Sequence, residues 1–490
     1  MTSLAALDEG SPTTANRQTD DPFDRKIARL RAGGRPRVLD TFAGCGGMSL
    51  GFELAGFSID AAVENDPLAA SSHGLNFHPE AEAAALPRDI TAVSAQDVVA
   101  GVGLGDEDMA FDVVIGGPPC QAYARVGRAK LREVAEHPQA FRVDPRGNLY
   151  LRWLDYVDHT KPLAVVMENV PDILNYGGHN IAAEIAEVLE EFGYEVRYSL
   201  INSAHHGVPQ MRDRIFLVGL HRRLDAEPSF PAATRHHVLP PGYAGTRAVA
   251  MKHVDPDRAH FVPADTGTPD LPPAVTAAEA IGDLPVVTKH LTGGLKRGAR
   301  RFDEFLPYQE DMEPSDYACR MREWPGHAND EGGIWDHALR YLPRDSDIFR
   351  AMRPGNQYPE AHAVAVRLFQ DAARKQGLSE ESPAWVEMRR AMVPPYPITS
   401  FPNRWWKMRR DQPVRTLMAH IGKDTYSHIH YDDAQARVMT VREAARLQSF
   451  PDGFRFAGTM NPAFRQIGNA VPPLMAAAIA GEVMAALRPA

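Results

Sequence analysis

The fold is decided by one stretch, Val38-Leu39-Asp40-Thr41-Phe42-Ala43-Gly44-Cys45-Gly46-Gly47, in a chain of 490 residues. Its first half is a short β-type run, and helix-compatible sequence follows from Met48 to Gly56. Glycines in such a turn let the backbone approach a ligand closely and offer it free N–H groups. The turn is not G-x-G-x-x-G. It therefore favours a nucleoside cofactor over a merely tight turn, and it leaves open which cofactor is bound.

Short apolar runs, each long enough for a buried strand, recur after this turn. They are Ile59 to Val63, Asp112 to Ile115, Ala164 to Met167 and Ile215 to Val218. Helical patterns separate them, most clearly from Ile181 to Phe192, where the apolar residues share one face. Strands that alternate with helices predict an α/β fold with a parallel sheet covered on both faces.

The alternation stops after about residue 225, where prolines become frequent. Helical sequence returns at Val441 to Gln448 and from about Pro472 to Leu487. We therefore predict a flexible leader over 1–36, an α/β domain over 37–225 and 430–490, and a largely irregular domain over 226–429. We expect some helix in the irregular domain, for example from Ala361 to Lys375.

Composition limits the classes of function. The chain has 53 Lys+Arg and 63 Asp+Glu, a net charge of −10, so any binding to nucleic acid must use local basic patches. Three cysteines cannot form a disulfide framework, and their spacing suits no zinc cluster, which indicates a reducing, cytoplasmic setting and no metal. No apolar run is expected to reach the roughly 20 residues that span a bilayer.

Four further features stand at the ends or entrances of predicted strands. Gly116 to Gln121, sequence GGPPCQ, holds Cys120 at the carboxyl end of the sheet, which favours a nucleophile over an inert buried thiol. Glu168 ends the next strand on the same rim and is a candidate acid. Before the strand Ile215–Val218, alternation sends Gln210, Arg212 and Arg214 to one side; without the other motifs, a salt-bridged strand entrance is the preferred explanation. Glu64, after the second strand, is placed to accept hydrogen bonds from ribose hydroxyls.

With these motifs in this order, the chain resembles a cytosine-5 DNA methyltransferase of the prokaryotic type. Other signatures of that family follow in its usual order: Glu64-Asn65, Asp89-Ile90, Thr440 to Gln448 and Gln466 to Pro473. The resemblance covers about 37–220 and about 436 to the end. Arg88 stands where the family often has glycine, and Ala122-Tyr123-Ala124 replaces a small-aromatic-serine run; neither departure touches the proposed chemistry.

The resemblance implies a Rossmann-like methyltransferase domain that uses S-adenosylmethionine, with a target-recognition domain inserted before the C-terminal segment. By resemblance, Phe42 and Ile90 flank the adenine, Asp89 meets its amino group and Glu64 the ribose. The turn after the first strand and Asn469 surround the methionine end. The full set of expected cofactor residues is Asp40, Phe42, Gly44, Gly46, Gly47, Glu64, Asn65, Asp89, Ile90, Pro118 and Asn469.

The expected mechanism is covalent. The Cys120 thiolate adds to C6 of the cytosine, Glu168 protonates N3, and Arg214 with Arg212 alongside holds O2. These atoms are unreachable in a stacked duplex, so the base must be flipped out. We expect the basic connection 121–146 to close over DNA, and the basic clusters Lys289–Arg301 and Arg404–Arg410 to contact it. His428 and His430 are expected to be structural.

We therefore predict a sequence-specific enzyme that acts on double-stranded DNA, in restriction-modification or related phage defence. A monomer is expected, with cognate restriction or defence proteins as partners. One alternative is a transfer-RNA cytosine-5 methyltransferase, against which the long proline-rich insertion argues. The other is a catalytically silent DNA-binding homologue, which the intact Cys120 and Glu168 disfavour.

Overall fold

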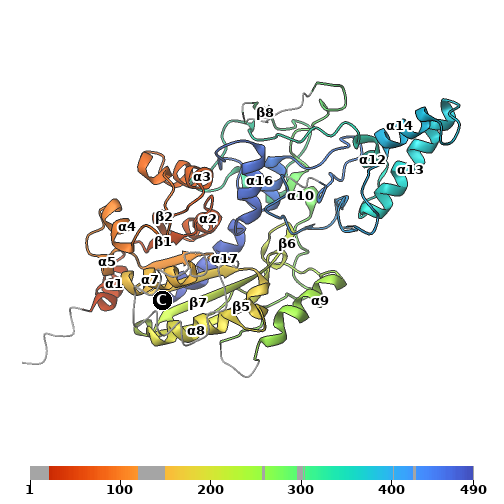
Figure 1. Ribbon diagram of the computed structural model, residues 1–490. Helices are drawn as coiled ribbons and strands as arrows, with labels where there is room; N and C mark the ends of the chain where they lie inside the picture. Colours follow the sequence, from red (N-terminus) through yellow and green to blue (C-terminus); the bar gives the residue numbers. More distant parts are fainter. Residues whose placement is uncertain are drawn as a thin grey trace, which may run out of the picture.

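The fold is built on a six-stranded sheet (Figure 1). The structure is a computed structural model that describes residues 21–119, 149–255, 260–294, 302, 304–400, 402–422 and 426–488. The strand order is β2-β1-β3-β4-β7-β5. The strands are β1 (Arg37–Thr41), β2 (Ser58–Val63), β3 (Val113–Gly116), β4 (Ala164–Asn169), β5 (Tyr194–Asn202) and β7 (Asp213–His221). The α/β fold class is confirmed.

The prediction of an all-parallel sheet is wrong at one strand. Strands β1 to β4 pair in parallel, but β7 runs antiparallel to both of its neighbours, β4 and β5. Only a short connection separates β5 from β7, too short for the crossover helix that a parallel return requires. An apolar run gives no information about strand direction, so the sequence could not reveal this reversal.

Two hydrophobic clusters cover the two faces of the sheet. Alternate strand residues point to opposite faces, so Val114 and Leu217 pack on one side while Ile115 and Phe216 pack on the other. One face is covered by α2 (Gly47–Leu54) and α17 (Pro473–Leu487), and the other by α4 (Ala95–Val102), α7 (Leu149–Thr160) and α8 (Ile181–Glu191). Helix α3 (Pro67–Phe77) follows β2.

The segment predicted as a flexible leader differs from that prediction at its end. Residues Pro22–Arg31 form helix α1. Lys26 on this helix is fully buried, and its Nζ donates to the carbonyls of Thr160 and Lys161, both at 2.8 Å. A polar composition conceals this docking, because the buried contact is made by a lysine rather than by an apolar stripe.

The C-terminal segment returns to the sheet as α15 (Val441–Leu447), α16 (Met460–Asn469) and α17. The expectation that no apolar run reaches membrane-spanning length is wrong. The helical stretch Met460–Leu487 is 28 residues long and apolar enough to cross a membrane by length and composition. However, Ala470–Pro472 divide it into two helices, and most of its apolar part is buried, with α17 packed along α2. The stretch is thus a core element of this fold.

The insertion between β7 and α15 is largely irregular, as predicted. In Figure 1, α13 and α14 project from the end of the molecule that lies away from the sheet. Helix α13 begins three residues before the predicted helix and ends where it was predicted to end. The insertion contains α9 (Pro241–Ala250), α10 (Ala277–Ile281), β8 (Leu306–Pro307), α11 (Asp316–Arg322), β9 (Gly333–Ile334), α12 (Ser346–Ala351), α13 (Tyr358–Lys375), α14 (Pro383–Met392) and β10 (Val414–Arg415).

Candidate active site

A pocket of about 830 Å³ opens at the carboxyl ends of β1 to β4, and we call it the active-site pocket. Ligands of open α/β sheets bind at this edge. Its walls come from the turn after β1, the β2–α3 connection, the GGPP segment after β3, the end of β4 and the residues around Arg212. The insertion between β7 and α15 and the C-terminal segment complete it, through 417–420 and 465–471.

The predicted cofactor residues come together in this pocket. All of them except Gly46 line it: Asp40, Phe42, Gly44, Gly47, Glu64, Asn65, Asp89, Ile90, Pro118 and Asn469. Gly46 caps helix α2 in a left-handed conformation (φ 100°), and a Cβ at this position would lie 2.3 Å from the Phe77 ring. Gly46 is therefore required by the turn and by packing on α3, and it does not line the pocket.

The turn after β1 is packed tightly against the C-terminal segment. A Cβ on Gly47 would lie 2.3 Å from the carbonyl oxygen of Val471, so no side chain fits there. Gly44, like Gly46, adopts a positive φ (57°), and its N–H donates a hydrogen bond to Glu64. The glycines thus bring backbone rather than side chains to the pocket wall.

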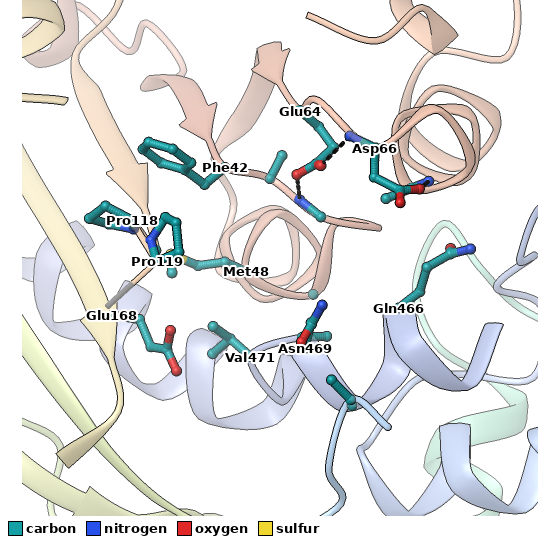
Figure 2. Close-up of a pocket in the computed structure, with 18 of the residues that line it drawn as sticks. Phe42, Met48, Glu64, Asp66, Pro118, Pro119, Glu168, Gln466, Asn469 and Val471 are labelled. Atoms are coloured by element: carbon teal, nitrogen blue, oxygen red, sulfur yellow. Dashed lines mark hydrogen bonds between the residues drawn. The ribbon is translucent and has the colours of Figure 1, made fainter. Parts of the chain in front are cut away.

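Glu64 organises one end of the pocket (Figure 2). Its Oε2 accepts a hydrogen bond from the Gly44 N–H at 2.8 Å, and its Oε1 accepts one from the Asp66 N–H at 2.7 Å. Burial raises the pKa of Glu64 above its usual range. Each carboxylate oxygen has a second lone pair, so these bonds orient Glu64 without exhausting its capacity to accept from a ligand.

A buried polar chain runs behind the turn. Asp40 accepts a hydrogen bond from the Ser49 hydroxyl at 2.6 Å, and the same hydroxyl lies 3.0 Å from Nε2 of His73. Burial raises the pKa of Asp40 to about 7 and lowers that of His73 to about 3. At neutral pH the histidine is therefore neutral, and Asp40 is a pocket carboxyl that titrates near pH 7.

Glu168 lies near Pro119 and Val471, away from Glu64 (Figure 2). The Nε of Arg214 is 2.8 Å from its Oε1, and the Glu168 residue is only 8% exposed. Both side chains line the pocket. The neighbouring Asn169 donates from Nδ2 to the Pro118 carbonyl at 2.7 Å, which ties the end of β4 to the GGPP segment. A carboxyl and a guanidinium are thus held together at this end of the pocket.

Cys120 and the connection 121–146 lie outside the described residues. Pro119, the residue before Cys120, lines the pocket. The assignment of Cys120 as nucleophile and of the connection as a closing loop stay predictions.

Arg212 and Arg214 both line the pocket, but they make different contacts. The guanidinium of Arg212 is fully buried and donates to three carbonyls, those of Leu417 at 2.8 Å and of Gly468 and Ala470 at 3.1 Å. Gln210 also contacts Leu417, because its Oε1 accepts a hydrogen bond from the Leu417 N–H at 2.8 Å. Arg212 therefore joins three chain segments, whereas Arg214 contacts the candidate acid.

Sequence reasoning missed several wall residues. Leu417, Met418, Ala419 and His420 line the pocket although they belong to the predicted recognition domain. They are brought there by backbone pairing of β10 with β6 (Gln210–Met211). No local pattern signals such a contact, because its partners are about 200 residues apart in sequence.

The basic clusters differ from the expectation in part. Trp405, Trp406 and Lys407 are buried: Trp405 stacks on Tyr426 with ring centroids 4.5 Å apart, and Lys407 Nζ donates to the Phe349 carbonyl at 2.7 Å. These three side chains therefore belong to the core of the insertion and are not available to DNA. Arg404, Arg409 and Arg410 are exposed. Residues 295–301 of the other cluster lie outside the described residues.

The two histidines expected to be structural are both buried. Burial lowers the pKa of His428 to about 4 and that of His430 to about 3. His428 Nε2 lies 3.0 Å from the Arg415 carbonyl, a backbone contact that accounts for its position. Within the part of the chain that the structure describes, no group of three or more His, Cys, Asp or Glu is arranged to hold a metal ion.

The fold of this chain is similar to that of a solved structure. The chain resembles the crystal structure of a putative DNA modification methyltransferase encoded within a prophage in E. coli, with a TM-score of 0.58 and 20% identity over 92% of this chain and 98% of that one. At this identity the likeness shows the fold alone, a Rossmann-like methyltransferase fold.

The sequence then identifies the family. The family model for C-5 cytosine-specific DNA methylases matches residues 36–263 and 358–485. The chain is also 36% identical to a putative type II methyltransferase, M.OihORF3336P of Oceanobacillus iheyensis, over 91% of this chain and 94% of the relative. It is 30% identical to the type II methyltransferase M.XorII of Xanthomonas oryzae, over 93% and 86%. The chain therefore belongs to the C-5 cytosine-specific DNA methylase family and is a DNA cytosine methyltransferase.

Proposed function

We propose that this enzyme methylates C5 of a flipped-out cytosine in a specific sequence of duplex DNA, with S-adenosylmethionine as the methyl donor. The observation that carries the proposal is the pairing of Glu168 with Arg214 in the same pocket as Glu64 and Asp40, with Pro119 leading directly to Cys120. The pocket thus combines Glu64 and Asp40, which suit the cofactor, with Glu168 and Arg214, which suit the cytosine ring.

The residues fit S-adenosylmethionine. Glu64 offers acceptors for ribose hydroxyls, and the buried Asp40 offers a carboxyl to the cationic methionine end. Phe42 and Ile90 provide apolar surface for the adenine. When bound, the cofactor supplies an electrophilic methyl group.

The protein's own groups prepare the cytosine. C5 is a weak nucleophile, and adding the Cys120 thiolate to C6 places electron density on C5. As the C6–S bond forms, Glu168 protonates N3. Oε1 of Glu168 faces Arg214, so Oε2 is the atom we assign to this transfer. After C5 gains its methyl group, a water molecule takes the C5 proton, the C5–C6 double bond re-forms as the C6–S bond breaks, and the Cys120 thiolate leaves. N3 returns its proton to Glu168.

Arg214 has two roles in this proposal. It orients Glu168 through its Nε, and its charge stabilises the cytosine O2 as the ring accepts electrons. Arg212 acts differently: its two terminal nitrogens donate to the carbonyls of Leu417, Gly468 and Ala470, so we assign it as a positioning residue.

Sequence specificity is proposed from the insertion and the relatives. Residues 226–429 occupy the place of a target-recognition domain, and M.OihORF3336P and M.XorII are named type II methyltransferases. We therefore propose a restriction-modification or related defence role, in the cytoplasm on the chromosome, for a monomer with cognate defence proteins as partners.

The test is transfer of a tritiated methyl group to duplex DNA and to transfer RNA, followed by bisulfite sequencing of the DNA. We expect label in DNA, at one sequence context, and none with a Cys120→Ser variant. Label in transfer RNA alone would refute the proposal, and an unimpaired Cys120→Ser enzyme would refute the nucleophile.

A further inference from the structure

The active-site pocket is assembled from two distant parts of the chain. One wall is formed by the β1 turn, the β2–α3 connection and α3, and the other by α16 and the residues after it. Below the rim, buried bonds hold these walls together: Ser72 Oγ donates to Gln466 Oε1 at 2.6 Å, and the Ala457 N–H donates to Ser72 Oγ at 2.8 Å.

At the rim, an ion pair crosses between the same two walls. Arg465 Nη2 on α16 lies 2.6 Å from Asp66 Oδ2 at the start of α3. The side chains are 51% and 34% exposed, yet both residues line the pocket. The pair is thus positioned where solvent and pocket meet, unlike the buried bonds below it.

Asp66 links this pair to the proposed ribose site. Its Oδ1 caps helix α3 by accepting from the N–H groups of Leu68 and Ala69, both at 3.0 Å. Its own N–H donates to Oε1 of Glu64. Arg465, Asp66 and Glu64 therefore form a continuous chain from α16 to the proposed cofactor carboxylate.

We propose that the Arg465–Asp66 ion pair is a strap across the rim of the active-site pocket that positions Glu64 and slows exchange of the nucleoside cofactor. This inference rests on the proposed S-adenosylmethionine site. An exposed ion pair contributes little to folding, so its effect belongs to cofactor exchange rather than to stability. Because both side chains are at least partly exposed, salt screens the strap.

The experiment measures the dissociation rate constant of S-adenosylhomocysteine from the full-length protein by stopped-flow displacement. Asp66→Asn keeps an oxygen to cap α3 but removes the charge, and Arg465→Gln removes the partner. We expect each to speed dissociation about two- to fivefold, the range for an exposed pair. We expect the double variant to be no faster than either single variant and Arg465→Lys to restore most of the effect.

Two comparisons distinguish loss of the Arg465–Asp66 ion pair from a general loss of structure around the pocket. Dissociation from the parent should speed up with added salt, and dissociation from the double variant should not. Arg455→Gln is the matched control, because Arg455 pairs with Glu331 at 3.4 Å with similar exposure and neither residue lines the pocket. Its dissociation rate should equal that of the parent.

The outcomes distinguish this inference from the function on which it rests. If the parent does not bind S-adenosylhomocysteine, the proposed cofactor site fails and the strap fails with it. If the parent binds but Asp66→Asn and Arg465→Gln dissociate at the parental rate, or their effects add, the strap alone is refuted.

Discussion

Charged side chains serve different purposes at the sheet edge and at the insertion between β7 and α15. At the edge, Glu64, Glu168 and Arg214 line the pocket and face the proposed ligands. Where the insertion meets α15, charges are buried and pair with each other: Arg446 contacts Asp283 at 3.0 Å and Asp452 at 2.6 Å, and Arg442 contacts Asp336 at 2.7 Å. A basic residue in this protein is therefore not by itself evidence of a DNA contact.

The largest effect is expected at the sheet edge, where the charge of Glu168 is proposed to serve catalysis. Glu168→Gln keeps the size of the side chain but cannot donate a proton to N3, so we expect kcat to fall about 10²- to 10⁴-fold. Binding of S-adenosylhomocysteine should be unchanged, because Glu168 lies away from Glu64. Single-turnover methylation measures the effect, with Glu195→Gln as an exposed control. A loss smaller than fivefold would contradict the assigned acid.

The next largest effect is expected at the insertion, where the buried ion pairs of Arg446 are proposed to stabilise the fold. Arg446→Met removes the cation between Asp283 and Asp452. Asp452 then loses its buried cation and Asp283 keeps only Arg322, which costs about 3–5 kcal/mol of folding free energy. Urea unfolding measures this loss. Arg222→Met, which breaks an exposed pair with Glu195, should cost about 1 kcal/mol or less. Equal losses in the two variants would show that the buried network is not what holds the insertion.

A smaller effect concerns pH at the cofactor end. The pKa of Asp40 is raised to about 7, so the carboxyl is protonated below that pH, whereas a cationic ligand favours its ionised form. Binding of S-adenosylmethionine should therefore release a proton, and affinity should rise about tenfold per pH unit below pH 7 and level off above it.

Calorimetry at several pH values checks this dependence. Asp40→Asn should flatten it, and Glu64→Gln, at the other carboxyl with a raised pKa, separates the two contributions. A pH dependence that survives in Asp40→Asn would assign the proton to another group.

The smallest effect distinguishes exposed from buried basic residues within the cluster Arg404–Arg410. Arg410 is exposed and Lys407 is buried, only three residues apart. If Arg410 contacts a phosphate, Arg410→Gln should weaken DNA binding a few-fold and reduce the slope of log K against log salt by about 1. Lys407→Met should lower stability and leave that slope unchanged. The reverse pattern would contradict the structural role of Lys407.

Most of the residues predicted from the sequence line one pocket at the sheet edge for a physical reason. Carboxyl ends of parallel strands meet at one edge, so motifs that follow β1, β2, β3 and β4 converge there. The role of Cys120 stays a prediction. The direction of β7, the docking of α1 through Lys26, the wall residues 417–420 and the Asp66–Arg465 pair could not be predicted, since each depends on partners remote in sequence and carries no periodic pattern.

The contacts of Arg212 show how the insertion is attached to the sheet domain. Arg212 and Gln210 hold the insertion at Leu417 through its main-chain carbonyl and N–H, and β10 joins β6 through main-chain pairing as well. Every amino acid carries the main-chain carbonyl, and every one except proline carries the N–H. These contacts do not depend on the side chains of residues 414, 415 and 417. We therefore expect another insertion whose backbone follows the path of 414–417 to be held in the same way.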